Sequence, residues 1–176
     1  MGLFGFSKKE ILIVSLIFSV LGAAVYVNLS VSLRKGRDAQ RKQDLWIIST
    51  ALIAYQNNRS SFPPSFEGKI EACNGPCRWH QDGLVDPITG EVYVGSLPAD
   101  PHHNKGARYY YISNGRYFQI YGALESAEEN EYDEGIVARN IMCGTRVCNF
   151  GKGFMGTPLD KSIEEYENEL RMRYEK

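Results

Sequence analysis

The sequence predicts an α+β protein, in which a long N-terminal membrane-spanning helix packs its outer half on a small antiparallel β-sheet. Three observations predict it: an uncharged apolar run over 11–33, an apolar stripe that follows the run, and a hairpin signature around Asn114-Gly115. An apolar fraction of 43% supplies a core and argues against disorder. The nearly balanced charge, 20 basic against 21 acidic side chains, disfavours a generally basic nucleic-acid binder, so no nucleic acid is expected as a partner.

The run from Ile11 to Leu33 contains no charged residue. At about 1.5 Å per residue it extends roughly 34 Å, enough to cross a hydrocarbon core of about 30 Å. A cleaved secretory signal is the alternative, with Gly22-Ala23-Ala24 as its cleavage site. Since the apolar run continues past Ala24 without a break, a membrane helix is the preferred interpretation.

The helix is expected to continue beyond the membrane, from Phe6 to about Asn58. Its outer half carries an apolar stripe at spacings of three and four residues, which is the signature of an amphipathic helix. The stripe consists of Leu45, Ile48, Leu52 and Tyr55. Pro63-Pro64 follow and end the helical pattern.

Three motifs then carry a resemblance to a known family. Gly5, Phe6 and Glu10 precede the apolar run, residues 37–45 follow it, and residues 97–101 read Leu-Pro-Ala-Asp-Pro before a Tyr-rich hairpin. In this order the motifs resemble the type IV pilin and pseudopilin family, which has a class III signal. The resemblance covers residues 5–63 and 97–125.

The resemblance implies that prepilin peptidase cleaves between Gly5 and Phe6. It also implies an assembly role for Glu10, whose carboxylate would pair with the Phe6 amine of a neighbouring subunit and set the register of a filament. A buried ion pair of this kind depends on good placement of both partners. The alternative is that Glu10 only extends to the lipid headgroups beside Lys8 and Lys9.

The implied function is that of a structural subunit, a pilin or pseudopilin, of a type IV pilus-like or type II secretion-like filament. Its partners would be copies of itself or related pilins, prepilin peptidase, the inner-membrane assembly machinery and, before assembly, membrane lipid. The chain would cross the inner membrane once and then enter an extracellular or periplasmic filament, although the count of basic residues on the two sides of the run favours the opposite orientation. Adhesion, motility, DNA uptake and secretion remain open. The alternative function is a monomeric membrane-anchored or secreted binding protein.

The expected organisation follows from these segments. It comprises a leader (1–5), a membrane and polymerisation helix (6–35), its amphipathic continuation (36–58), a globular loop and sheet domain (59–156) and a charged C-terminal helix (157–176). In the last segment Ile163, Tyr166, Leu170 and Tyr174 form a stripe that would dock on the domain or a neighbouring subunit. Gly151, Gly153 and Gly156 before it suggest a hinge.

The sheet is expected to contain a short strand at Glu91–Val94, a hairpin and a third strand at Ile136–Cys143. Asn-Gly between β-rich runs predicts a two-residue type I′ loop, in which Ser113 pairs with Arg116 and Tyr111 with Phe118. One face of the hairpin should then pack on the helical stripe. That face comprises Tyr109, Tyr111, Phe118, Ile120 and Leu124.

The four cysteines form two close pairs, Cys73 with Cys77 and Cys143 with Cys148. In an exported domain an even number of cysteines predicts two disulfides, and turn-forming sequence between the members of each pair favours local closure. The other two connectivities stay open. A zinc site of four thiolates is the alternative, although its usual spacing is shorter.

No other site is expected to bind a cofactor or metal. His102 and His103 have only His80 as a further histidine, and their loop predicts solvated side chains. An acidic cluster is also expected to be solvated, with calcium binding as the alternative; it consists of Glu125, Glu128, Glu129, Glu131, Asp133 and Glu134. Because no nucleophile accompanies a histidine and no phosphate-binding loop is present, an enzyme is not expected.

Overall fold

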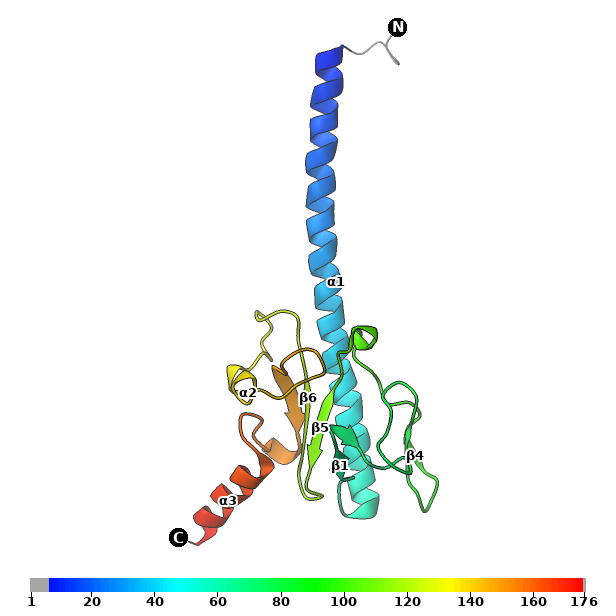
Figure 1. The fold of residues 1–176 in the computed structure, drawn as a ribbon, viewed down its shortest axis with the longest axis vertical. Coiled ribbons are helices and arrows are strands. Elements are labelled where there is room, and N and C mark those ends of the chain that lie inside the picture. The colour runs from blue at the N-terminus through cyan, green and yellow to red at the C-terminus, as the bar shows by residue number, and fades with distance from the viewer. Residues whose placement is uncertain (1–6, 176) are drawn as a thin grey trace. The chain divides into compact units, whose positions relative to one another are not determined.

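The computed structural model describes residues 7–175 and divides the chain into two compact units, Met1–Arg37 and Asp38–Lys176 (Figure 1). Helix α1 (Lys8–Arg59) contributes to both units. The first unit is the N-terminal part of this helix. The second combines the rest of α1 with short antiparallel strands, so the predicted α+β class is confirmed.

Three small antiparallel sheets make up the β-structure of the second unit. They are β1 (Ser65–Phe66) with β2 (Lys69–Ile70), β3 (Leu84–Val85) with β4 (Val92–Val94), and the central sheet of β5 (Tyr110–Ser113), β6 (Phe118–Gly122) and β7 (Phe150–Gly153). The strand expected at Glu91–Val94 is therefore present as β4. The short helices are η2 (His103–Lys105), α2 (Glu134–Ala138) and η3 (Phe154–Gly156), and α3 (Ile163–Tyr174) follows them.

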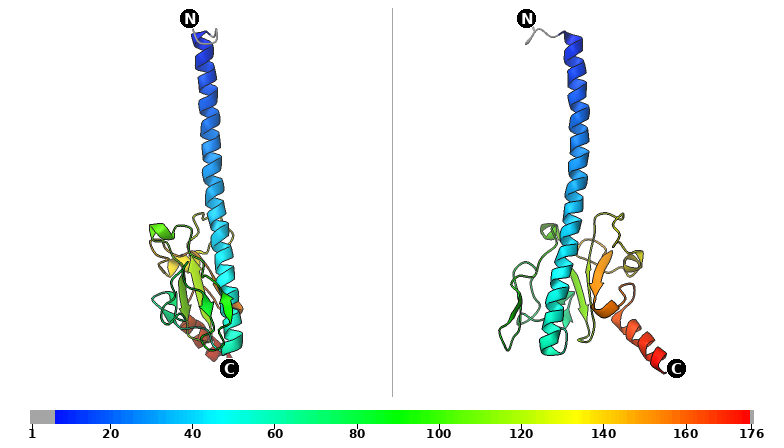
Figure 2. Two further views of the ribbon diagram at one scale, coloured as in Figure 1. Left: turned by 90° about the vertical axis from the view of Figure 1, so that its right-hand side faces the viewer. Right: turned by 180° about the vertical axis from the view of Figure 1, so that it is seen from behind.

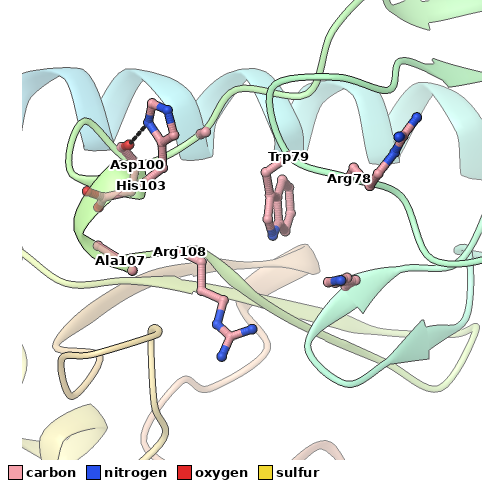
Figure 3. Close-up of a pocket in the computed structure, with 9 residues that line it drawn as sticks. Arg78, Trp79, Asp100, His103, Ala107 and Arg108 are labelled. Carbon is pink, nitrogen blue, oxygen red and sulfur yellow. Dashed lines mark hydrogen bonds between the residues drawn. The ribbon is translucent and has the colours of Figure 1, made fainter.

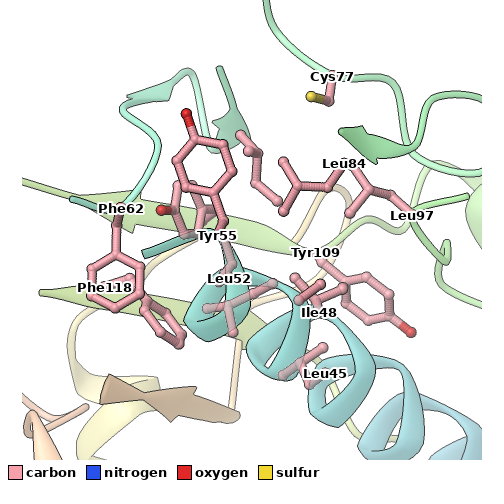
Figure 4. Close-up of a cluster of buried hydrophobic side chains, with 14 of the residues drawn as sticks. Leu45, Ile48, Leu52, Tyr55, Phe62, Cys77, Leu84, Leu97, Tyr109 and Phe118 are labelled. Carbon is pink, nitrogen blue, oxygen red and sulfur yellow. The ribbon is translucent and has the colours of Figure 1, made fainter. Parts of the chain in front are cut away.

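The core of the second unit lies between α1 and the hairpin β5–β6 (Figure 4). The views of Figures 1 and 2 agree that these strands lie along the C-terminal half of α1. The predicted stripe and the predicted hairpin face meet in one buried cluster, and each of the nine side chains is at most 9% exposed. Apolar burial of this kind is the main stabilising term of a small domain.

The predicted hairpin register is wrong by two residues. Ser113 pairs with Phe118 and Tyr111 with Ile120, so four residues form the loop instead of two. The Asn114 side chain stabilises the longer loop, because its Oδ1 accepts hydrogen bonds from the backbone N–H groups of Arg116 (3.1 Å) and Tyr117 (2.9 Å). A shift of two residues keeps each side chain on its face of the sheet, and the predicted face therefore survives.

The third strand is not at Ile136–Cys143. Residues 134–138 form α2, because the carboxylate of Asp133 accepts a hydrogen bond from the Gly135 N–H (2.7 Å) and caps the helix. The third strand of the central sheet is β7, which pairs antiparallel with β6 on the side opposite β5. The predicted hinge is corrected at the same time, since Gly151 and Gly153 lie inside β7. A side chain at Gly151 would lie 2.6 Å from the Ile120 carbonyl oxygen, which explains why glycine is used here.

The C-terminal helix begins at Ile163, with Ser162 as its N-cap and Glu165 completing a capping box. Its first turn docks on its own domain: Ile163 is 5% exposed, and the ring of Tyr166 meets that of Tyr117 edge to face with ring centroids 5.4 Å apart. Docking on the domain was one of the two predicted alternatives for this helix.

Both cysteine pairs form local disulfides, Cys73–Cys77 and Cys143–Cys148. Next to each disulfide an isolated β-bridge joins a residue before the loop to one inside it, Glu71 to Pro76 and Met142 to Val147. Since all four sulfurs are used in these bonds, the zinc alternative is wrong.

Candidate assembly surface and charged cluster

The start of α1 holds Glu10, the residue predicted to act in assembly. Its Oε2 accepts a hydrogen bond from the Ser7 backbone N–H (2.7 Å), and the Ser7 Oγ accepts one from the Glu10 N–H (3.3 Å). This reciprocal pair is a capping box, a motif that Ser-x-x-Glu at a helix start signals in the sequence and that the sequence analysis missed. Gly5 and Phe6, predicted as the processing site, lie outside the described residues.

The apolar surface of α1, residues 11–33, is exposed along its whole length. An 18-residue stretch of α1 has a mean hydropathy of 2.3, and none of it is buried. By length and composition the helix is therefore able to cross a membrane. Polar side chains in it bond within the helix: Ser19 Oγ donates to the Ser15 carbonyl (2.9 Å) and Ser30 Oγ to that of Val27 (2.8 Å). Internal satisfaction of polar groups is what a hydrocarbon environment requires.

A second feature lies in the other unit, where Arg41 of α1 is fully buried among three carboxylates. Its guanidinium donates to Asp38 (2.7 Å), to both oxygens of Asp100 (2.8 and 3.2 Å) and to Glu125 (2.9 Å). Asp38 in turn accepts hydrogen bonds from the backbone N–H groups of Glu125 (2.8 Å) and Ser126 (3.1 Å). This cluster, here called the Arg41 cluster, ties α1 to the loops before and after the hairpin.

The two sequence motifs on either side of the globular loop meet in this cluster. Arg41 comes from the segment after the apolar run, and Asp100 comes from the Leu-Pro-Ala-Asp-Pro motif. Neither residue has a role that the motifs alone predict. A signal was present: extending the apolar stripe of α1 toward its N-terminus by four and then three residues from Leu45 leads to Arg41 and Asp38, on the same helix face.

Burial and hydrogen bonding set the ionisation of these groups. Burial alone would lower the pKa of Arg41, but its hydrogen bonds and charge attraction to Asp100 raise that pKa above the ordinary value, so the guanidinium stays charged. Burial raises the pKa of Asp44, a neighbouring carboxylate that accepts a hydrogen bond from the Tyr109 hydroxyl (2.6 Å), and that bond partly opposes the rise. Burial, and then the bond to Asp44, raises the pKa of Tyr109.

The acidic loop is held against the helix instead of being wholly solvated. Lys42 contacts Glu129 and Glu131, each at 2.6 Å, while Glu125 belongs to the Arg41 cluster. The hydrogen bonds that Lys42 donates to Glu129 and Glu131 raise the pKa of Lys42. Within residues 7–175 no group of three or more His, Cys, Asp or Glu side chains is arranged to hold a metal ion.

The three histidines gather near the same loop. His103 is exposed, as its loop predicted, whereas His102 is half-buried; His80 is exposed as well. His80 stacks on His103 with ring centroids 5.5 Å apart. His103 Nδ1 lies 3.0 Å from the Asp100 carbonyl oxygen, and His102 Nδ1 lies 3.6 Å from the Glu125 carboxylate. Their partners are the backbone and carboxylates of the Arg41 cluster, so these histidines help to build the loop.

Comparison with known proteins adds one relative. The type II secretion system core protein G of Dickeya chrysanthemi is 29% identical to this chain over 122 residues, which cover 66% of the chain and 72% of the relative. No family model matches, and neither does any solved structure. The resemblance that the sequence motifs indicated is confirmed by this relative: the chain is a homologue of a pseudopilin, the type II secretion core protein G.

Proposed function

We propose that this chain is a structural subunit of a type II secretion-like filament and that it polymerises through the N-terminal part of α1. The observation that carries the proposal is the exposed apolar surface at residues 11–33, on a chain homologous to a pseudopilin. Such a surface is stable only when lipid or other helices cover it. Lipid covers it before assembly, and the same helices of neighbouring subunits cover it in the filament.

The proposal extends to the first residues of the chain. Prepilin peptidase removes residues 1–5, and the new Phe6 amine of one subunit pairs with the Glu10 carboxylate of another. The subunit has no enzymatic role, crosses the inner membrane once before assembly and becomes part of a periplasmic filament built with its own copies or related pseudopilins. Apolar packing between helices gives little register in lipid, so a charged pair is needed to define the axial position.

The test is the yield of filaments from variants at Glu10. We expect Glu10→Ala to leave the second unit folded, since the core and the disulfides lie elsewhere, and to reduce the yield strongly. Loss of one partner from a well-buried ion pair costs about 3–5 kcal/mol. Glu10→Asp should be intermediate, because it keeps the charge on a shorter side chain. The measurement is sheared filament against total membrane-bound subunit at equal expression, with intact mass to locate the new N-terminus.

Ser7→Ala is the matched control. It removes the hydroxyl half of the capping box but keeps the Glu10 carboxylate. If Ser7→Ala reduces the yield as much as Glu10→Ala, the carboxylate acts only on its own helix. Wild-type yield from Glu10→Ala, or filaments that retain residues 1–5, would contradict the proposal.

A further inference from the structure

A basic pocket lies in the second unit, and Asp100 of the Arg41 cluster is among the residues that line it (Figure 3). It has a volume of about 440 Å³, and its lining includes the cationic side chains of Lys69, Arg78 and Arg108 together with Trp79. Asp100 also lines it, but the carboxylate of Asp100 is already bonded to Arg41 and to the His102 N–H. The pocket therefore presents mainly positive charge.

Trp79 supplies the second observation. Its ring is held edge-to-face against Tyr109, with centroids 5.9 Å apart. Its indole nitrogen is buried and has no hydrogen-bond partner among the described residues. Figure 3 shows the nitrogen edge of Trp79 turned toward the side of the pocket where Arg108 lies. A buried donor without an acceptor is costly, and a ligand oxygen in the pocket would satisfy it.

The three cationic side chains of the pocket differ in whether they already form ion pairs within the chain. Arg78 is paired with Asp82, to which it donates two side-chain hydrogen bonds (2.8 and 3.1 Å). For Lys69 and Arg108 the described part of the chain provides no ion pair. Two cations and one N–H donor thus line a space whose carboxylate, Asp100, is already bonded to Arg41 and to the His102 N–H. This is the donor set that a carboxylate needs, since its two oxygens accept charge-assisted hydrogen bonds.

We propose that this pocket binds a side-chain carboxylate from α3 of a second copy of the chain. Residues 160–169 carry five acidic side chains and one basic one. In the described structure Glu164, in the first turn of α3, is exposed and makes no ion pair, whereas the acidic loop is bound to Lys42 and Arg41 of its own chain. Charge complementarity therefore favours α3 as the occupant. The contact between copies rests on the proposed function, because a filament brings copies together.

The test is a titration of the full chain in zwitterionic detergent micelles with a capped synthetic peptide of residues 160–175. The chain has two tryptophans, so ¹⁵N-indole labelling gives two signals, and Trp46→Phe identifies that of Trp79. We expect the Trp79 indole proton to move downfield and saturate, while the Trp46 signal stays constant. Added salt should weaken the binding, because solvent-accessible charges are screened over about 10 Å at 0.1 M.

Variants separate a built site from diffuse attraction. Trp79→Phe keeps the ring on Tyr109 but removes the N–H, and we expect about tenfold weaker binding of a fluorescent version of the peptide. Arg108→Met should also weaken binding, whereas Lys105→Met, which removes a nearby cation outside the pocket lining, should not. A Trp79 signal that does not move, equal binding of a peptide with Glu164, Glu165 and Glu167 changed to Gln, or equal effects of Arg108→Met and Lys105→Met would overturn the proposal. None of these results depends on filament formation, so the two proposals fail separately.

Discussion

Arg41 is the residue whose replacement should most destabilise the second unit without changing its apolar core. Arg41→Met keeps a side chain of similar length but removes four hydrogen bonds to three carboxylates. Asp38 and Asp100, at 0% and 2% exposed, would remain buried without a cation. Breaking a buried charge pair in this way costs about 3–5 kcal/mol, which is a large part of the roughly 5–15 kcal/mol that stabilises a whole domain.

The assay is urea unfolding of the full chain in micelles with the disulfides intact, followed by Trp79 fluorescence in a Trp46→Phe background. Lys42→Met is the matched control, because Lys42 is the next residue of α1 and also pairs with two carboxylates. Its side chain is 26% exposed, so we expect a loss of at most about 1 kcal/mol. Adding Asp100→Asn to Arg41→Met should recover part of the stability, since one uncompensated charge is removed.

If Arg41→Met costs no more than Lys42→Met, the carboxylates of the Arg41 cluster find other partners or water, and the cluster is not what holds the loops on α1. If the double variant is less stable than Arg41→Met alone, the loss comes from hydrogen bonds that Asp100 makes to its own loop and not from unpaired charge.

Two further predictions concern the loops. The backbone N–H groups of Thr89 and Ile88 lower the pKa of Asp86 from 3.8 to about 2, so its contribution to stability is present above pH 3.8 and is lost as the pH falls toward 2. Asp86→Asn should therefore be destabilised at pH 6, and its difference from the wild type should shrink between pH 4 and 2; a difference that does not depend on pH would contradict this. Gly144→Ala should lower stability by at least about 1 kcal/mol in thermal unfolding, because the residue has φ +78° and its Cβ would lie 1.9 Å from the Gly106 carbonyl oxygen. Gly95→Ala, where the new Cβ meets nothing within 4 Å, is the control, and an equal loss from both changes would show that the close approach is not what matters.

The elements that have a periodic pattern of apolar residues could be predicted from the sequence. The stripe of α1 and the alternation of the hairpin each encode one buried face, and the structure joins these faces. The loop length between β5 and β6 could not be predicted in the same way. Asn114-Gly115 fits both a two-residue and a four-residue loop, and the hydrogen bonds from the Asn114 side chain decide between them.

The position of the third strand also depends on contacts that the residue pattern does not reveal. Residues 136–143 have β-branched and apolar members, but Asp133 begins a helix there and Arg139, in its C-cap, points its guanidinium to the Leu159 carbonyl (2.9 Å). The third strand, β7, contains two glycines, a residue type that is disfavoured in strands. Glycine is needed in β7 because of the close approach of the Ile120 backbone to Gly151, and that contact exists only in the folded chain.

The Arg41 cluster was missed because it joins residues far apart in the sequence. Arg41 and Asp100 are separated by 59 positions, and Arg41 and Glu125 by 84. Each residue alone looks like one charge among many, and burial is what distinguishes it. The helix face that leads from Leu45 back to Arg41 and Asp38 would have indicated that the two charges point toward the domain, although not which carboxylate they meet.

Glu10 has one role in the single chain and another in the proposed filament. In the single chain its carboxylate bonds the Ser7 N–H and completes a capping box, in which loss of the Ser7 hydroxyl cap typically costs about 0.5–2 kcal/mol. In the proposed filament the same carboxylate binds the Phe6 amine of a neighbour, one residue before the Ser7 of that neighbour. A carboxylate has two oxygens and accepts more than one hydrogen bond, so both interactions are compatible if the second partner approaches the free Oε1. The cap would then hold the carboxylate in position before assembly. Ser7→Ala keeps the N–H that binds the carboxylate but weakens the first turn by removing the hydroxyl cap, so it should affect the rate at which filaments form more than their final amount.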